Sequence, residues 1–161
     1  MSHTELSMLT ENLIRSAIFG LSVLVVVTFF SGAILIRINI KFSSYCQSKT
    51  IHSSLPLRVH FVYAVFKLCL VQIVAMLMWT AAVYAAGLTE NLRLAFMFVG
   101  SCFTTLGIVS DIFPVEWQSV AFYIAFSGLF SFAFATSVMI SLVTEVVKAL
   151  PKHTHDQTSG V

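Results

Sequence analysis

Charged residues are scarce in this chain of 161 residues: they make up 10% of it, whereas soluble domains average about 25%. Hydrophobic residues make up 58%, and the mean hydropathy is +0.92. This composition excludes an ordinary soluble domain and predicts an integral membrane protein of one domain. The net charge of +2 is too small to indicate a nucleic-acid partner.

Cysteine is scarce too, and Cys46, Cys69 and Cys102 are scattered and odd in number. They indicate neither a disulfide framework nor a zinc site. The sequence also lacks a paired acid and base, a nucleophile constellation and a nucleotide-binding loop. We therefore expect no enzyme activity, no bound cofactor and no soluble small-molecule substrate. A haem would need a second histidine at the depth of His60, and the other histidines lie in tails or loops.

Three apolar runs are long enough to cross a bilayer, which takes about 20 helical residues: Ser16–Ile36, Val59–Leu88 and Trp117–Thr144. The first is expected to be retained rather than cleaved, because the segment before it lacks a net positive charge. Trp79 and Tyr84 are expected at the membrane interface. The domain organisation is a polar segment over 1–12, a membrane domain over 13–150 with a pore module over about 59–148, and a polar tail over 151–161.

A fourth apolar run, Leu94–Ser110, is short for a span and is broken by glycines and a threonine pair. The positive-inside rule places the basic loop Arg37–Arg58 in the cytoplasm and the N-terminus outside. If the fourth run crossed the membrane, Lys148 and Lys152 would lie outside, against that rule. The charge pattern therefore favours an all-α fold with three transmembrane helices and a re-entrant half-helix, Leu92–Phe103, between the second and third. A fourth crossing helix or an ordinary packing segment are the alternatives.

The segment Phe103–Pro114 reads FTTLGIVSDIFP and follows that half-helix. The order of a helix, a short helix, Thr-Thr-x-Gly, Asp, Pro and a long helix is similar to the potassium-channel pore-domain family. FTTLG at Phe103–Gly107 resembles the start of the family's TTxGYGD filter, and DIFP at Asp111–Pro114 resembles the Asp-x-x-Pro that follows it. Gly128 resembles the inner-helix hinge glycine. The resemblance covers about residues 89–145, and small bacterial channel-like proteins with an extra N-terminal helix are most similar to the whole chain.

The resemblance implies a homotetramer in the plasma membrane (the inner membrane of a bacterium) that conducts K⁺ or other monovalent cations passively. Backbone carbonyls in such a filter replace the hydration shell of the ion. The residues implied for the ion-conduction filter are Thr104, Thr105, Leu106, Gly107, Ile108 and Val109. Those implied for the outer mouth are Ser110 and Asp111, and those for the inner-helix hinge and cavity are Gly128, Ser127, Ser131 and Ala135. The C-terminus is expected in the cytoplasm, and the lipid bilayer is the other partner.

The chain departs from the family where Ile108-Val109-Ser110 replaces Tyr-Gly. A β-branched residue at positive φ is an outlier, so a standard potassium filter is not expected in the outer half. We therefore expect cation permeability, and the sequence leaves potassium selectivity open. Two other hypotheses stay open: a non-conducting assembly subunit that keeps the pore scaffold, and a redox or transport subunit that uses Lys67 and His60.

Several of these residues also have ordinary structural interpretations. Asp111 is either a solvated charge or part of a ring that concentrates cations. Lys67 is either a functional intramembrane lysine or one that extends to the cytoplasmic interface. The small residues Ser127, Ser131 and Ala135 suit a water-filled cavity or close helix packing, and Gly128 suits a hinge or a neighbouring helix.

Overall fold

The computed structural model describes residues 3–48, 54–107 and 117–149, over which the chain forms four helices. They are α1 (His3–Ser48), α2 (Ser54–Ala85), α3 (Leu92–Phe103) and α4 (Val120–Ala149). Three of them are long and apolar enough to cross a membrane, over Thr10–Cys46, Leu57–Ala85 and Val120–Lys148. Over the described residues, the structure confirms the prediction of an all-helical protein with three helices long and apolar enough to cross a membrane.

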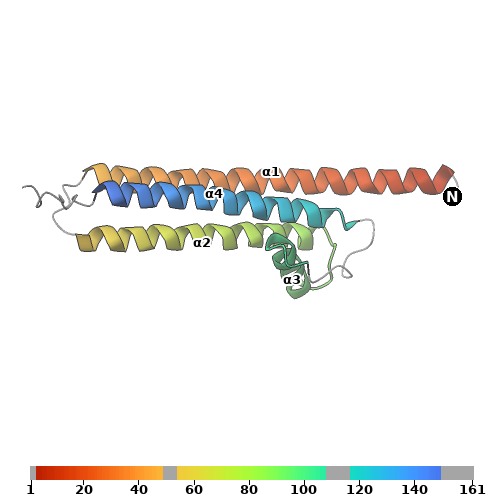
Figure 1. The fold of residues 1–161 in the computed structure, drawn as a ribbon. Coiled ribbons are helices and arrows are strands. Elements are labelled where there is room, and N and C mark those ends of the chain that lie inside the picture. The colour runs from red at the N-terminus through yellow and green to blue at the C-terminus, as the bar shows by residue number, and fades with distance from the viewer. Residues whose placement is uncertain (1–2, 49–53, 108–116, 150–161) are drawn as a thin grey trace, which may run out of the picture.

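The three long helices lie side by side, with α1 and α4 parallel and α2 antiparallel to both (Figure 1). The short helix α3 lies against the end of α2 that is near the beginning of α4 (Figure 1). Its 12 residues measure about 18 Å, which is less than the roughly 30 Å of a hydrocarbon core. Helix α3 is therefore too short to be a fourth crossing helix, and its bounds are those predicted for the half-helix.

Helix α1 is longer than the sequence indicated, because its 46 residues include most of the polar segment 1–12 and part of the predicted basic loop. Residues 33–48 contain neither glycine nor proline, so no residue of that stretch ends the helix. Ile38, Phe42 and Cys46 recur every fourth position and pack on one hydrophobic cluster. This packing stabilises the helix beyond the hydrophobic run that predicted it.

Two hydrophobic clusters hold the bundle together. One surrounds Trp79, which is 0% exposed, and joins residues from all four helices. The other joins α1, α2 and α4 through residues that include Leu35, Leu68 and Leu142. The Trp79 side chain is buried inside the chain, in a cluster with residues of α3 such as Phe98, and its depth in a membrane stays a prediction.

Polar pairs connect α1 to α4. The Ser16 and Ser119 hydroxyl groups are 2.8 Å apart, one in α1 and the other just before α4. Further along the same two helices, the Ser141 hydroxyl donates to Asn39 Oδ1 at 3.0 Å. Such interhelical hydrogen bonds contribute about 0.6 kcal/mol on average in membranes, so they fix the register of parallel helices more than they add stability.

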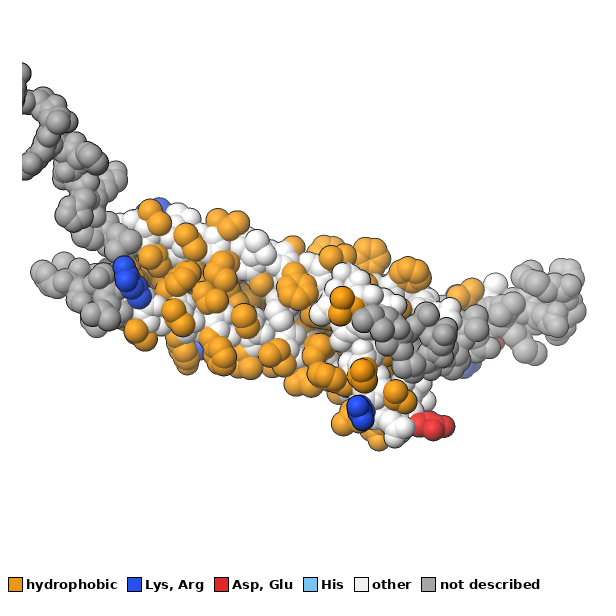
Figure 2. Space-filling view, turned by 60° about the horizontal axis from the view of Figure 1, so that its bottom comes forward, with side chains coloured by type: hydrophobic (Ala, Val, Ile, Leu, Met, Phe, Trp, Pro, Cys, Tyr) orange, Lys and Arg blue, Asp and Glu red, His pale blue; other side chains and the backbone are white. Residues whose placement is uncertain are grey.

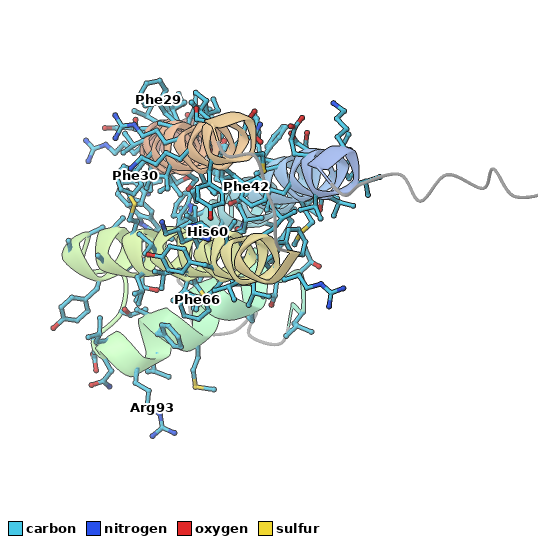
Figure 3. All side chains as sticks on the ribbon, turned by 90° about the vertical axis from the view of Figure 1, so that its left-hand side faces the viewer. Phe29, Phe30, Phe42, His60, Phe66 and Arg93 are labelled. Atoms are coloured by element: carbon cyan, nitrogen blue, oxygen red, sulfur yellow. The ribbon has the colours of Figure 1, made fainter. Side chains whose placement is uncertain are left out.

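The outer surface of the bundle is apolar. Hydrophobic side chains cover the face drawn in Figure 2, and charged side chains lie toward the ends. Phe29 is 80% exposed, and seen along the bundle it points away from the other helices (Figure 3). A soluble monomer seldom exposes a contiguous apolar patch of more than a few hundred Å². This surface is suited to contact with lipid chains or with further copies of the chain.

Candidate functional site

The candidate site begins with α3, which buries one face against α2 and α4. Ala95, Phe98, Val99 and Phe103 are buried on that face, whereas Leu92 and Met97 are exposed on the other. The helix is preceded by Asn91 in an extended conformation, and the Asn91 carbonyl accepts a hydrogen bond from the Ala95 N–H at 3.1 Å. The amphipathic pattern thus fixes which way the end of α3 points.

Helix α3 ends in a Schellman motif at Thr104–Leu106. The Leu106 N–H donates to the Ser101 carbonyl at 2.8 Å, and the Thr105 N–H donates to the Cys102 carbonyl at 3.0 Å. Thr105 occupies the left-handed position of the motif with φ 60°, where glycine is usual. A β-branched residue at this φ is an outlier, so the backbone stores strain at the first predicted filter residues.

The peptide groups after α3 share one orientation. The N–H groups of Thr105, Leu106 and Gly107 all donate back to carbonyls of α3, and the described residues contain no cis peptide. Because N–H and C=O point in opposite directions across a trans peptide, the carbonyls of Thr104, Thr105 and Leu106 point away from the helix end. Among the described residues, the Thr105 and Leu106 carbonyls accept no hydrogen bond.

The threonine hydroxyls form local hydrogen bonds. Thr104 Oγ1 donates to the Gly100 carbonyl and Thr105 Oγ1 to the Thr104 carbonyl, each at 2.7 Å. Leu106 is 66% exposed, and Gly107 has φ 63° in open surroundings, with no described atom within 4 Å of where a Cβ would lie. The remaining predicted filter and mouth residues lie outside the described residues: Ile108, Val109, Ser110 and Asp111.

Gly128 lies directly against the end of α3. A Cβ atom at this position would overlap the carbonyl oxygen of Phe103. The rings of Phe103 and Phe132 also touch, with centroids 5.9 Å apart. Helix α4 runs without a break from Val120 to Ala149. Close packing is therefore a sufficient reason for this glycine, and its role as a hinge stays a prediction.

The predicted cavity residues Ser127 and Ser131 are buried within the chain, at 1% and 4% exposure. Ser131 Oγ donates to Gln72 Oε1 at 2.6 Å, and Gln72 Nε2 donates to the Ser131 carbonyl at 3.0 Å. For Ser131 the structure shows the packing alternative, and Ala135 is half-buried. The pairing with Gln72 was not predicted, although Gln72 is the single side-chain amide in the second apolar run.

Small and hydroxyl-bearing residues are also exposed on α4, at Ala133, Thr136 and Ser137. They lie one to three turns beyond Gly128, toward the C-terminal end of the helix. A stripe of this kind can line a cavity or pack against another copy of the helix. These residues, rather than Ser127 and Ser131, are available to a surface outside the chain.

A second polar region, which we call the basic groove, lies between α1 and α2. It has a volume of about 470 Å³, and its polar lining residues are Arg37, Lys41, Tyr45, His60, Tyr63 and Lys67. The sequence points to Lys67 and His60, but nothing in it shows which α1 residues face them. The described residues contain no group of three His, Cys, Asp or Glu side chains that could bind a metal ion.

Comparison with models of protein families, with curated proteins and with solved structures finds no match to this chain. The resemblance to the potassium-channel pore domain therefore rests on the residues Phe103–Pro114 and on the order of the helices.

Proposed function

We propose that this chain is the subunit of a homotetrameric cation channel of the potassium-channel class, which conducts K⁺ or, with poor selectivity, monovalent cations. The segment Thr104–Gly107 forms the inner half of its filter. Helix α3 is the re-entrant pore helix that delivers this segment to the pore. The direction of the backbone carbonyls supports the proposal, and it could not be read from the sequence alone.

The observation that carries the proposal is the shared orientation of three successive carbonyls, those of Thr104, Thr105 and Leu106, away from the end of α3. The partial negative charges of these three carbonyl oxygens therefore lie on one side of the chain. The C-terminal end of the α3 dipole adds negative potential at the same place. Two of the three carbonyls, those of Thr105 and Leu106, accept no hydrogen bond among the described residues. Backbone carbonyl oxygens are the ligands that replace water around K⁺ in a filter.

One chain supplies only one row of these carbonyls, so an ion must be surrounded by several copies of the segment. Four copies around an axis would meet through the exposed apolar faces of α3 and α4. The exposed small residues Ala133, Thr136 and Ser137 are candidates for the wall of the cavity below the filter. This assignment replaces the one made from sequence for Ser127 and Ser131.

The proposed orientation follows the distribution of charge. Arg37, Lys41, Arg58 and Lys148 belong to the end of the bundle at which α1 and α4 finish (Figure 1). The positive-inside rule assigns this end to the cytoplasm, with the N-terminus and α3 on the outer side. The proposed location is the plasma membrane, or the inner membrane of a bacterium.

The test is cation flux in liposomes that contain the purified full-length protein, with K⁺ and Na⁺ compared. Gly107→Ala is expected to reduce K⁺ flux at least tenfold, because a side chain at φ 63° distorts the carbonyl row. Gly87→Ala is the matched control, since Gly87 has φ 68° and no neighbour within 4 Å of an added Cβ, but lies in the α2–α3 connection. Equal flux in the two variants would refute the filter assignment.

The second candidate, a non-conducting assembly subunit, is favoured by the missing second filter glycine in Gly107–Asp111. It predicts a tetramer by cross-linking or mass photometry without flux of either ion. A monomer that passes no cation would refute both candidates.

A further inference from the structure

The basic groove between α1 and α2 combines positive charge with an apolar extension. Its basic side chains, Arg37, Lys41 and Lys67, come from both helices. Its apolar lining includes Ile34, Leu70, Val71 and Val74. We propose that this groove binds an anionic phospholipid, with the headgroup phosphate at the basic side chains and an acyl chain along the apolar extension.

The charges of the groove are uncompensated within the described residues. The ion pairs there are Arg15–Glu11 and Lys148–Glu145, and neither involves a basic side chain of the groove. The groove lining contains no carboxylate. Cationic side chains without a counter-charge are energetically costly inside a membrane. An anionic ligand in the groove would supply that counter-charge.

Aromatic rings shape the entrance of the groove. The rings of Tyr45 and His60 stack at a centroid distance of 3.9 Å across the two helices. The Lys67 ammonium lies over the ring of Tyr63, 4.2 Å from its centroid. This cation–π contact keeps the ammonium group at the groove instead of in the water beyond the helix end. In Figure 3, His60 and Phe42 lie in the space between α1 and α2.

The length of the groove decides between a lipid and a soluble phosphate. Lys67 lies seven residues beyond His60 along α2, and Val74 lies a further seven, which adds about 10 Å for each step. A soluble phosphate compound would fill only the basic part and leave the apolar part empty. A lipid satisfies both parts, and basic pockets between membrane helices commonly bind anionic headgroups.

The test is native mass spectrometry of the full-length protein released from micelles with phosphatidylglycerol or phosphatidylcholine. The unmodified protein is expected to bind the first phosphatidylglycerol at least tenfold more tightly than phosphatidylcholine. Lys67→Gln and, separately, Lys41→Gln should each weaken phosphatidylglycerol binding about fivefold, since each basic residue contributes about 1 kcal/mol near an anionic surface. Binding of phosphatidylcholine should not change.

Arg58→Gln is the matched control, because Arg58 is an exposed basic residue of α2 that does not line the groove. If Arg58→Gln weakens binding as much as Lys67→Gln, the attraction belongs to the whole basic end and the proposal is wrong. Inorganic phosphate and deacylated glycerophosphoglycerol should not displace the lipid at millimolar concentration. Displacement by either one would identify a soluble ligand and overturn the lipid assignment. Because the assay needs no ion flux, it is independent of the proposed channel function.

Discussion

Replacing Gly128 by alanine tests the contact on which the position of α3 depends. The added Cβ would overlap the Phe103 carbonyl oxygen. A backbone carbonyl has no rotamer through which to move aside, so the end of α3 must shift. Overpacking of this kind costs about 1–3 kcal/mol of the free energy of unfolding. Alanine also favours helix over glycine by about 0.5–1 kcal/mol, which offsets part of that cost.

Gly32→Ala separates these two effects, because a Cβ at Gly32 has no neighbour within 4 Å and lies inside α1. This control should stabilise the protein by about 0.5–1 kcal/mol. The difference between the variants then isolates the contact and should be about 1–3 kcal/mol. Reversible unfolding in mixed micelles with SDS, followed by circular dichroism, measures it. Equal stability of the two variants would refute the packing of Phe103 on Gly128.

Two further predictions concern hydrogen bonds and backbone strain. A double-mutant cycle with Gln72→Leu and Ser131→Ala should give a coupling of about 0.6–1.7 kcal/mol in the same unfolding assay, and a coupling of zero would contradict the observed pair. Thr105→Gly should stabilise the end of α3 relative to Thr105→Ala by about 1 kcal/mol, because only glycine removes the cost of φ 60°. Slower amide hydrogen exchange at residues 104–107 in the glycine variant would show this, and equal exchange would exclude a left-handed backbone there.

Much of the architecture could be predicted from the apolar runs, because a helix in a bilayer must be both long and uncharged. The half-length of α3 followed from the shortness of its run and from the charge on either side. The bounds of α1 could not be predicted this way. Its polar extension to Ser48 is stabilised by packing against α2 and α4. Such packing is harder to recognise in a sequence than a long uncharged run.

The candidate site was predicted less completely. Ser127 and Ser131 illustrate the reason, since cavities and helix interfaces both favour small hydroxyl residues. Only the register between α2 and α4 reveals that Ser131 faces Gln72. The basic groove depends in the same way on which face of α1 meets α2. Arg37 and Lys41 stand four residues apart, which places them on one helix face, but the opposing residue Lys67 is far away in the chain.

The parallel pairing of α1 with α4 sets the order in which the fold can be completed during synthesis. Ser16 and Ser119 are 103 residues apart in the chain, and Asn39 and Ser141 are 102 apart. The first helix to enter the bilayer must therefore wait for the last before Ser16 and Asn39 acquire these interhelical partners. Until then, the side chains of Ser16 and Asn39 face lipid, water or the translocation machinery. Substitutions that slow the insertion of α4 should thus expose α1 to degradation, even though they lie a hundred residues downstream.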